Sequence, residues 1–270
     1  MTVAHPTHQL VEALQAGGPT VVLTGAGISL ASGIPTFRGT DAGAVWASNV
    51  MARATLQHFR REPADSWSWY RERLGRVLAA RPNAAHRALV DLERWQTGRG
   101  ADFLAITQNI DLLHEAAGAR ALVKVHGSID RARCLDTSCP ASETTVPTAS
   151  LDFAAFDAHP EAVTVPRCVV CGGLMRPHVL WFDEHYGSHP DYGWPTVLEA
   201  CDTMRLVIAV GTSFSVGVTD LIAGEAGRRG VPLFVVDPQG ASIAGRGVVG
   251  LRDKAEDLLP RLCALVGAPA

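Results

Sequence analysis

Short apolar runs separated by amphipathic stretches dominate the chain. The apolar runs do not alternate with polar residues, which is the pattern of strands buried on both faces of a parallel sheet. They cover residues 20–23, 103–106, 121–125, 206–210 and 233–236. Helical periodicity covers residues 6–16, 83–95, 110–117, 219–229 and 254–265. The alternation of the two patterns predicts a doubly wound, Rossmann-like α/β fold with a parallel sheet.

Small and polar residues follow every predicted strand. Open parallel sheets bind their ligands where the strands reach their carboxyl ends. The residues at those ends are Gly25-Ala26-Gly27, Thr107-Gln108-Asn109, His126-Gly127, Gly211-Thr212-Ser213 and Asp237. The pattern therefore predicts a ligand site along one edge of the sheet.

Two stretches interrupt the α/β alternation, and we expect them to form a second, small domain. Residues 40–81 are predicted to be helical, with an apolar stripe of Trp67, Tyr70, Leu74 and Val77, and residues 128–176 hold four paired cysteines. The expected domains are a Rossmann-like domain of residues 1–39, 82–127 and 177–270, a helical insertion of residues 40–81 and a zinc-binding module of residues 128–176. A cleft between the domains is the expected substrate site.

Composition narrows the classes of partner. The 270 residues are 47% hydrophobic, with a net charge of −3 and a pI near 6.4. Nucleic acids and anionic membranes attract clustered positive charge, so the balance argues against both. The amino-terminal segment lacks a secretory apolar core, and no apolar run could span a bilayer, so we expect a cytoplasmic protein. The oligomeric state cannot be read from the sequence, which is compatible with a monomer.

A glycine-rich segment, GAGISLASGIPTFRG at residues 25–39, follows the first predicted strand. Glycine has no Cβ, so its backbone N–H can approach a phosphate closely. Gly25 and Gly27 match the first two glycines of the dinucleotide fingerprint, but Gly33 comes six residues after Gly27, where three are expected. Alone, the pattern leaves open a nucleotide site and an ordinary strand-to-helix turn.

Four of the six cysteines form two close pairs. The pairs are Cys134 with Cys139 and Cys168 with Cys171. Together they can supply four thiolates to one tetrahedral Zn²⁺, and a site closed by four protein ligands is structural. A redox pair at Cys168 and Cys171 is the alternative, but no thioredoxin-like unit surrounds them. Cys201 and Cys263 lie in apolar helical surroundings and are expected to be packing residues.

The motifs and their order closely resemble the sirtuins over almost the whole chain. They are GAGISLASGIPTFRG, TQNID at 107–111, His126-Gly127, the two cysteine pairs, RPHVLWFDE at 176–184 and GTS at 211–213. The resemblance implies an NAD-dependent protein lysine deacylase with a Rossmann-like large domain, a small zinc domain and acylated proteins as partners.

The resemblance also implies the site residues. His126 takes the place of the general base, a task that suits an imidazole because its pKa lies near neutrality, and Asn109 lies in the catalytic group. Val179, Trp181 and Phe182 are the implied peptide contacts. As alternatives, His126 could cap a strand end, and Asn109 and Asp111 could cap a helix. The implied NAD contacts are Gly25, Ala26, Gly27, Ser29, Thr36, Phe37, Arg38, Gln108, Ile110, Asp111, Gly211, Thr212, Ser213, Asp237 and Ala255.

Acyl selectivity depends on two residues of a predicted helix. Tyr70 and Arg73 are three residues apart and share a face. Tyr-x-x-Arg at this place, together with Thr36, resembles the sirtuin branch that prefers succinyl- and malonyl-lysine, in which arginine binds the distal carboxylate. A packed tyrosine beside a solvated arginine is the alternative. Asp183 stands where the family usually has glycine in the peptide-binding loop, which leaves the choice of substrate open.

Two other functions compete with deacylation. One is an NAD-consuming ADP-ribosyltransferase or NAD hydrolase that uses the same site. The other is a non-catalytic sensor of NAD or ADP-ribose, against which the presence of both Asn109 and His126 argues.

Overall fold

The computed structural model describes residues 5–36, 52–215, 217–240, 243–245 and 247–268. Phe37 and Arg38, two of the expected NAD contacts, lie outside the described residues, as does the first part of the expected helical insertion. No helix within these ranges is long and apolar enough to cross a membrane.

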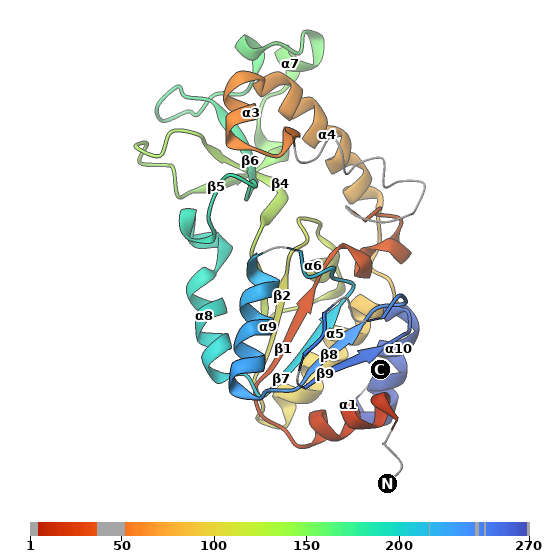
Figure 1. Ribbon diagram of the computed structural model, residues 1–270. Coiled ribbons are helices and arrows are strands. Elements are labelled where there is room, and N and C mark those ends of the chain that lie inside the picture. Colours follow the sequence, from red (N-terminus) through yellow and green to blue (C-terminus); the bar gives the residue numbers. More distant parts are fainter. Residues whose placement is uncertain (1–4, 37–51, 216, 241–242, 246, 269–270) are drawn as a thin grey trace.

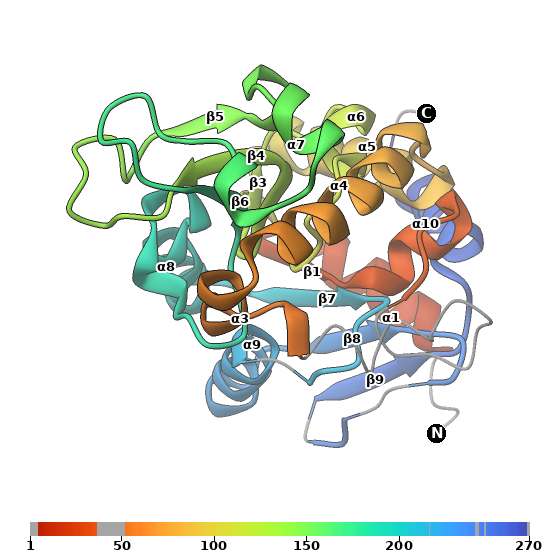
Figure 2. The same ribbon diagram turned by 90° about the horizontal axis from the view of Figure 1, so that it is seen from above.

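A six-stranded parallel sheet forms the centre of the larger part of the molecule (Figures 1 and 2). Its strand order is β3-β2-β1-β7-β8-β9, so the chain builds outward from β1 first on one side and then on the other. The order reverses between β1 and β7, which is where such sheets open a crevice for ligands. The strands are β1 (Thr20–Thr24), β2 (Phe103–Thr107), β3 (Leu122–Lys124), β7 (Leu206–Val210), β8 (Leu233–Val236) and β9 (Val248–Leu251).

Helices cover both faces of this sheet, as the continuous apolar runs predict. In β7, Leu206, Ile208 and Val210 belong to the core under one set of helices, whereas Val207 and Ala209 belong to the core under the other. The first set is α1 (Pro6–Gln15), α5 (Ala84–Gly98) and α10 (Ala255–Val266), and the second is α8 (Trp194–Thr203) and α9 (Gly217–Arg229). The predicted fold class is confirmed, although the sequence patterns missed β9 and α8.

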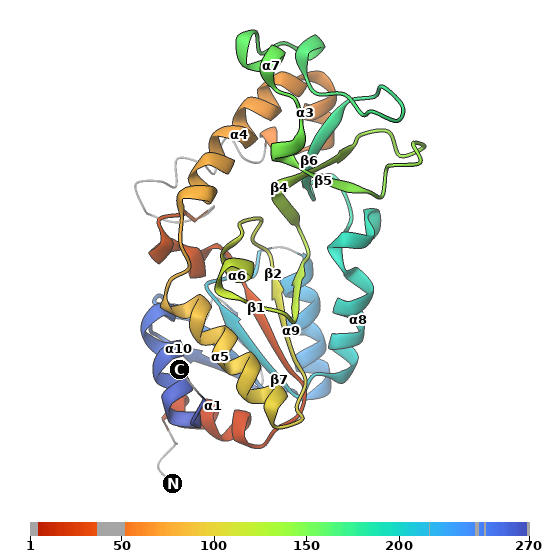
Figure 3. The same ribbon diagram turned by 180° about the vertical axis from the view of Figure 1, so that it is seen from behind.

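A smaller lobe stands over the carboxyl-terminal edge of the sheet (Figures 1 and 3). Its antiparallel sheet has the order β5-β4-β6, and one apolar core joins this sheet to the helices before it. Trp67 in that core donates from Nε1 to the carbonyl of Met175 at 2.8 Å. The elements of this small lobe are α3 (Leu56–Arg61), α4 (Pro63–Ala79), β4 (Gly127–Cys134), β5 (Thr145–Pro147), η3 (Thr148–Ser150), α7 (Ala154–Ala158), η4 (Ala162–Thr164) and β6 (Met175–Val179).

Short elements line the junction of the two parts. The glycine-rich segment turns directly after β1 into a 3₁₀ helix, η1 (Ala26–Ser32). The helix expected at 110–117 is shorter, because α6 (Leu113–Ala117) begins only after the residues that reach the sheet edge. After β6 the chain returns to the large part through η5 (Tyr186–Ser188) and η6 (Pro190–Tyr192).

Candidate active site

Glycines lock the turns after β1 and β7 against each other. The Gly27 N–H donates to the Gly211 carbonyl oxygen at 2.9 Å. A Cβ added at Gly25 would lie 2.7 Å from that oxygen, and one added at Gly27 would lie 2.7 Å from Gly211 Cα. Gly33 has φ +83° and ends η1 as a left-handed cap, which explains why the third glycine comes late. These glycines therefore pack two turns of the protein together at the switch point of the sheet.

Ser29, Asn109 and Asp111 form one buried polar group beside these turns. The Ser29 hydroxyl donates to Asp111 Oδ2 at 2.8 Å, and Asn109 Nδ2 donates to Ser29 Oγ at 3.2 Å and to the Gly25 carbonyl at 3.1 Å. The other oxygen of Asp111 accepts the N–H of Leu113, the first residue of α6, at 3.0 Å. All three side chains are buried. The N-cap residue of α6 is Leu112, so Asp111 lies one residue before the cap position and connects the polar group to the start of the helix.

Gln108 joins the ends of three strands. Its Nε2 donates to the Thr24 carbonyl at 3.2 Å and to Thr212 Oγ1 at 3.0 Å. The backbone carbonyl oxygen of Gln108 lies 2.7 Å from His126 Nδ1. Residues after β1, β2, β3 and β7 therefore meet in one hydrogen-bonded group, as their positions at the carboxyl ends of parallel strands predict.

His126 lies half-buried between β3 and β4, and its ring is oriented from both sides. Because a carbonyl oxygen only accepts, Nδ1 carries the proton that it shares with Gln108, and Nε2 keeps a lone pair. Nε2 lies 3.5 Å from the Tyr186 hydroxyl. Burial lowers the pKa of His126 to about 4, against a smaller opposing effect of the Gln108 carbonyl. The imidazole is therefore neutral at physiological pH and can accept a proton at Nε2.

The remaining expected NAD contacts differ in their surroundings. Asp237 accepts the Gln239 N–H at 2.8 Å in the turn after β8, and the exposed Ser213 hydroxyl bonds the Ser215 hydroxyl at 2.7 Å. Ala255 begins α10 and is buried in the apolar core of the sheet. Ile110 packs against the core of the small lobe.

Trp181, one of the expected peptide contacts, meets Tyr70, the tyrosine of the expected acyl pocket, in the small lobe. Trp181 Nε1 donates to the Tyr70 hydroxyl at 2.8 Å, and both side chains are buried. The Arg176 guanidinium lies 3.5 Å from the centre of the Trp181 ring. Val179 is also buried, whereas Phe182 is 50% exposed. Burial raises the pKa of Tyr70, so this phenol keeps its proton and can donate it.

Arg73 lies one turn after Tyr70 on α4 and is partly buried. Its guanidinium stands 3.4 Å from the centre of the Trp69 ring, and its NH1 donates to the Trp69 carbonyl at 3.1 Å. Burial lowers the pKa of Arg73 to about 10, so the group is still positively charged at neutral pH. Stacking fixes the plane of the guanidinium, which limits the entropy lost when it binds an anion.

Asp183 has a structural role that sequence reasoning missed. Its two carboxylate oxygens accept the N–H groups of Leu56 and Gln57, at 2.7 and 3.0 Å, at the first turn of α3. The neighbouring Phe182 N–H donates to the Ala54 carbonyl at 3.0 Å. The expected peptide-binding loop is therefore attached to α3 by its backbone and by this carboxylate, a contact between segments too distant in the sequence to leave a local signal.

Glu184, the next residue, forms a buried ion pair that also escaped the sequence analysis. Its carboxylate lies 2.5 and 2.8 Å from the two terminal nitrogens of Arg176 and accepts the Trp181 N–H at 3.0 Å. Burial alone would raise the pKa of Glu184, but the hydrogen bonds and charge of Arg176 outweigh it and lower that pKa. The pair fixes the turn that carries Trp181.

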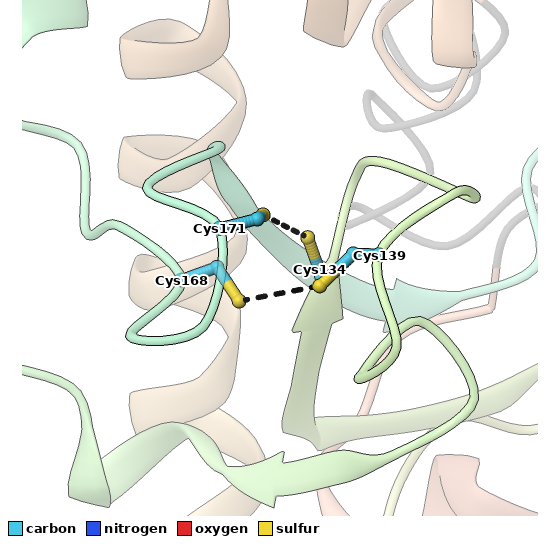
Figure 4. A group of neighbouring side chains, drawn as sticks. All are labelled: Cys134, Cys139, Cys168 and Cys171. Atoms are coloured by element: carbon cyan, nitrogen blue, oxygen red, sulfur yellow. Dashed lines mark hydrogen bonds between the residues drawn. The ribbon is translucent and has the colours of Figure 1, made fainter.

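The four paired cysteines converge on one point (Figure 4). Cys134 Sγ lies 3.5 Å from Cys171 Sγ, and Cys139 Sγ lies 3.9 Å from Cys168 Sγ. Zinc–sulfur bonds of about 2.3 Å in a tetrahedron separate the sulfur atoms by about 3.8 Å, so the cluster fits one Zn²⁺. Cys201 and Cys263 lie instead in the two cores of the parallel sheet, as packing residues should.

A second group of possible metal ligands, His178, His189 and Asp191, is different in character. Asp191 Oδ2 already accepts from the Thr145 hydroxyl at 3.2 Å, and His189 Nδ1 accepts the Asp191 N–H at 3.1 Å. Positive charge from three arginines acts on His178, which opposes a bound cation. Only the cysteine cluster therefore has the donor set and the charge of a metal site among the described residues.

Comparison with known proteins identifies relatives over most of the chain. The family model described as Sir2 family matches residues 25–218. An NAD-dependent protein deacylase 2 of Pyrobaculum aerophilum is 38% identical over 90% of this chain and 88% of its own. The mitochondrial NAD-dependent protein deacylase sirtuin-5 of the dog is 37% identical over 79% of this chain and 70% of its own. A crystal structure of a Sir2 homologue in complex with NAD is 33% identical, with a TM-score of 0.77 over 96% of this chain and 93% of that one.

Proposed function

The chain belongs to the Sir2 family, and from that premise we propose that it is an NAD-dependent protein lysine deacylase. In this reaction the acyl group of a lysine side chain passes to ADP-ribose and nicotinamide is released. The observation that carries the proposal is the geometry of His126, whose Nδ1–H is held by the backbone carbonyl of Gln108 and whose Nε2 therefore keeps its lone pair. Gln108 directly precedes Asn109, which belongs to the buried polar group at the switch point of the sheet.

NAD supplies the ribose carbon that the acyl oxygen attacks once nicotinamide leaves. We assign Asn109, Asp111 and Gln108 to the nicotinamide ribose side, because hydrogen bonds to neighbouring residues fix all three side chains next to the glycine turns. His126 removes a proton from a ribose hydroxyl at Nε2 while Gln108 holds its Nδ1–H. The backbone and hydroxyls of Gly211, Thr212 and Ser213 border the phosphate side of the same edge, and Asp237, at the end of β8, is suited to accept from adenosine ribose hydroxyls.

Zinc has a structural role in this proposal. Three of the four cysteines are buried, and four thiolates would fill the tetrahedral shell that Zn²⁺ prefers, which would leave no position for a reacting water. The ion would tie the end of β4 to the turn at Cys168 and Cys171, within the core that also holds Tyr70 and Trp181. The metal thus supports the peptide side of the site from a distance.

We further propose that the acyl pocket accepts succinyl and malonyl groups and also acetyl groups. Tyr70 and Arg73 support this assignment, since a phenol that keeps its proton and a stacked guanidinium share one face of α4 beside Trp181. A distal carboxylate would accept from both groups, and charge-assisted hydrogen bonds of this kind are the stronger ones.

The test is a panel of acetyl, malonyl, succinyl and long-chain acyl-lysine peptides incubated with NAD, with nicotinamide and deacylated peptide measured together. We expect one deacylated peptide for each nicotinamide released. Nicotinamide release without matching deacylation would establish the NAD hydrolase or ADP-ribosyltransferase instead. Binding of NAD without release of nicotinamide from any mixture would establish the non-catalytic sensor.

Replacing Arg73 tests the acyl assignment. Arg73→Met should lower kcat/KM for desuccinylation about tenfold or more, because a charge-assisted hydrogen bond is lost, and should leave deacetylation within about twofold. Arg76→Met is the matched control, since Arg76 lies on the same helix and pairs with Glu72 on its exposed side. Equal losses for both acyl groups in Arg73→Met would make Arg73 a structural residue.

A further inference from the structure

Tyr186 follows the expected peptide-binding loop and packs against the core that lies under α8 and α9. Its ring lies nearly parallel to that of His126, with 5.8 Å between centroids and 17° between planes. It also stacks on Trp194 at the start of α8, at 4.5 Å and 11°. Its hydroxyl accepts the Val218 N–H at 3.2 Å, in the first turn of α9. Three elements therefore fix this tyrosine next to the candidate base.

The Tyr186 hydroxyl is a suitable partner for His126 in both of its protonation states. A phenol has one donor and two acceptor positions, and the Val218 N–H occupies one acceptor. The hydroxyl hydrogen can point at the lone pair of neutral Nε2, and the second acceptor position can take the Nε2–H of the imidazolium. The separation of 3.5 Å is long, as catalytic hydrogen bonds often are before substrate binds.

We propose that Tyr186 is a positioning residue for the base, which holds the His126 ring and stabilises its protonated form during turnover. This inference rests on the proposed deacylase function. In the step it serves, the ribose O–H bond breaks and an Nε2–H bond forms on His126, while Tyr186 keeps its own proton throughout. Burial raises the pKa of Tyr186, which is consistent with a phenol that remains protonated.

Few charged groups act on His126 and Tyr186, so the effect of the Tyr186 hydroxyl on the pKa of His126 can be measured by itself. Among the described residues, no charged side chain contributes to the lowered pKa of His126, which has burial as its main cause. Of the charged groups in the described part of the chain, Asp220, in the first turn of α9, is the one that acts on the pKa of Tyr186. A change in the pKa of His126 in a Tyr186 variant can therefore be attributed to the lost hydroxyl.

The experiment compares Tyr186→Phe, which keeps the stacked ring, with wild-type protein. The pKa of His126 is read by NMR of histidine-labelled, zinc-loaded protein without NAD, with the signal assigned by its absence in His126→Ala. We expect the pKa to fall by roughly half a unit to one unit, because a charge-assisted bond to the imidazolium is stronger than the bond to the neutral ring. We expect kcat for deacylation to fall about two- to tenfold, with little change in KM.

Tyr192→Phe is the matched control, since it removes the hydroxyl of a buried tyrosine that stacks on His178 and should leave the pKa of His126 unchanged. A lower melting temperature of Tyr186→Phe with an unchanged pKa of His126 would overturn the inference and make Tyr186 a packing residue. The NMR readout needs no turnover, so it separates failure of this inference from failure of the proposed function, which would show as a wild-type protein without deacylase activity.

Discussion

The edge of the parallel sheet and the small lobe are organised in different ways. At the sheet edge, polar side chains bond one another and the backbone: Gln108 donates to the Thr24 carbonyl and the Thr212 hydroxyl, and Asn109 donates to the Ser29 hydroxyl and the Gly25 carbonyl. In the small lobe, a three-stranded sheet and a shared apolar core carry four cysteines whose thiolates would repel one another unless a cation bound them. Hydrogen bonds within the chain hold the first region together, whereas we expect a zinc ion to hold the second.

Removing zinc should separate the two regions most strongly. Zinc binding to structural sites is worth about 10 kcal/mol or more, so chelation, or Cys168→Ser, should unfold the small lobe and abolish deacylation. Near-UV circular dichroism should lose the signal of the packed tryptophans, while far-UV circular dichroism keeps that of the parallel sheet. Cys201→Ser, outside the cluster, should retain one zinc per chain. A zinc-free protein with an unchanged melting temperature and unchanged activity would show that the small lobe does not depend on the ion.

Replacing His126 at the sheet edge should have the opposite result to removing zinc: activity should be lost while the structure is retained. His126→Ala should lower kcat about 10²- to 10⁴-fold, the usual contribution of a general base, and change the melting temperature by less than about 2 °C. The wild-type enzyme should keep its activity as pH falls through the usual histidine value of 6.5 and lose it only as pH approaches about 4, because the base acts in its neutral form. His159→Ala, at an exposed histidine, is the control. An acid limb near 6.5 would show that His126 is not desolvated in the working enzyme.

Replacing Asp183 should have the smallest effect of the three changes, a loss of stability confined to the small lobe. Asp183→Gly removes the carboxylate that caps α3 and should cost about 1 kcal/mol, seen as a fall of about 3 °C in melting temperature. Asp183→Asn keeps one acceptor oxygen and should lie between glycine and wild type. Because the sheet edge does not depend on this cap, NAD affinity measured by calorimetry should not change in either variant. A weaker affinity for NAD would mean that the loop and the sheet edge are coupled.

The fold could be predicted where local sequence decides structure. The runs at Leu206–Val210 and Leu233–Val236 were predicted with the correct bounds, because a strand buried on both faces is apolar at every position. Strand β9 was missed, because the first three of its four residues are not buried and it stands at the edge of the sheet. Helix α8 was missed as well, since exposed apolar residues such as Leu198 blur its periodicity.

The candidate site was predictable in its residue types but not in its contacts. Gln108, Asn109 and His126 follow predicted parallel strands directly, which places them at one edge of the sheet, and the spacing of the cysteines indicates their cluster. Two contacts left no local signal: Asp183 on α3, and Tyr186 beside His126. Each joins segments that only tertiary folding brings together, so periodicity and spacing could not reveal them.

The interlocked glycines at the switch point have a consequence for how this site can change. The backbone of Gly211 occupies the space that a Cβ atom would need at Gly25 and at Gly27. Gly211 itself has φ +57°, and a Cβ added there would lie 2.5 Å from the Ile28 nitrogen. An added carbon atom would therefore push the central strands apart before it touched any bound molecule. The three positions therefore tolerate change only together, so a different ligand preference has to come from the side chains around them.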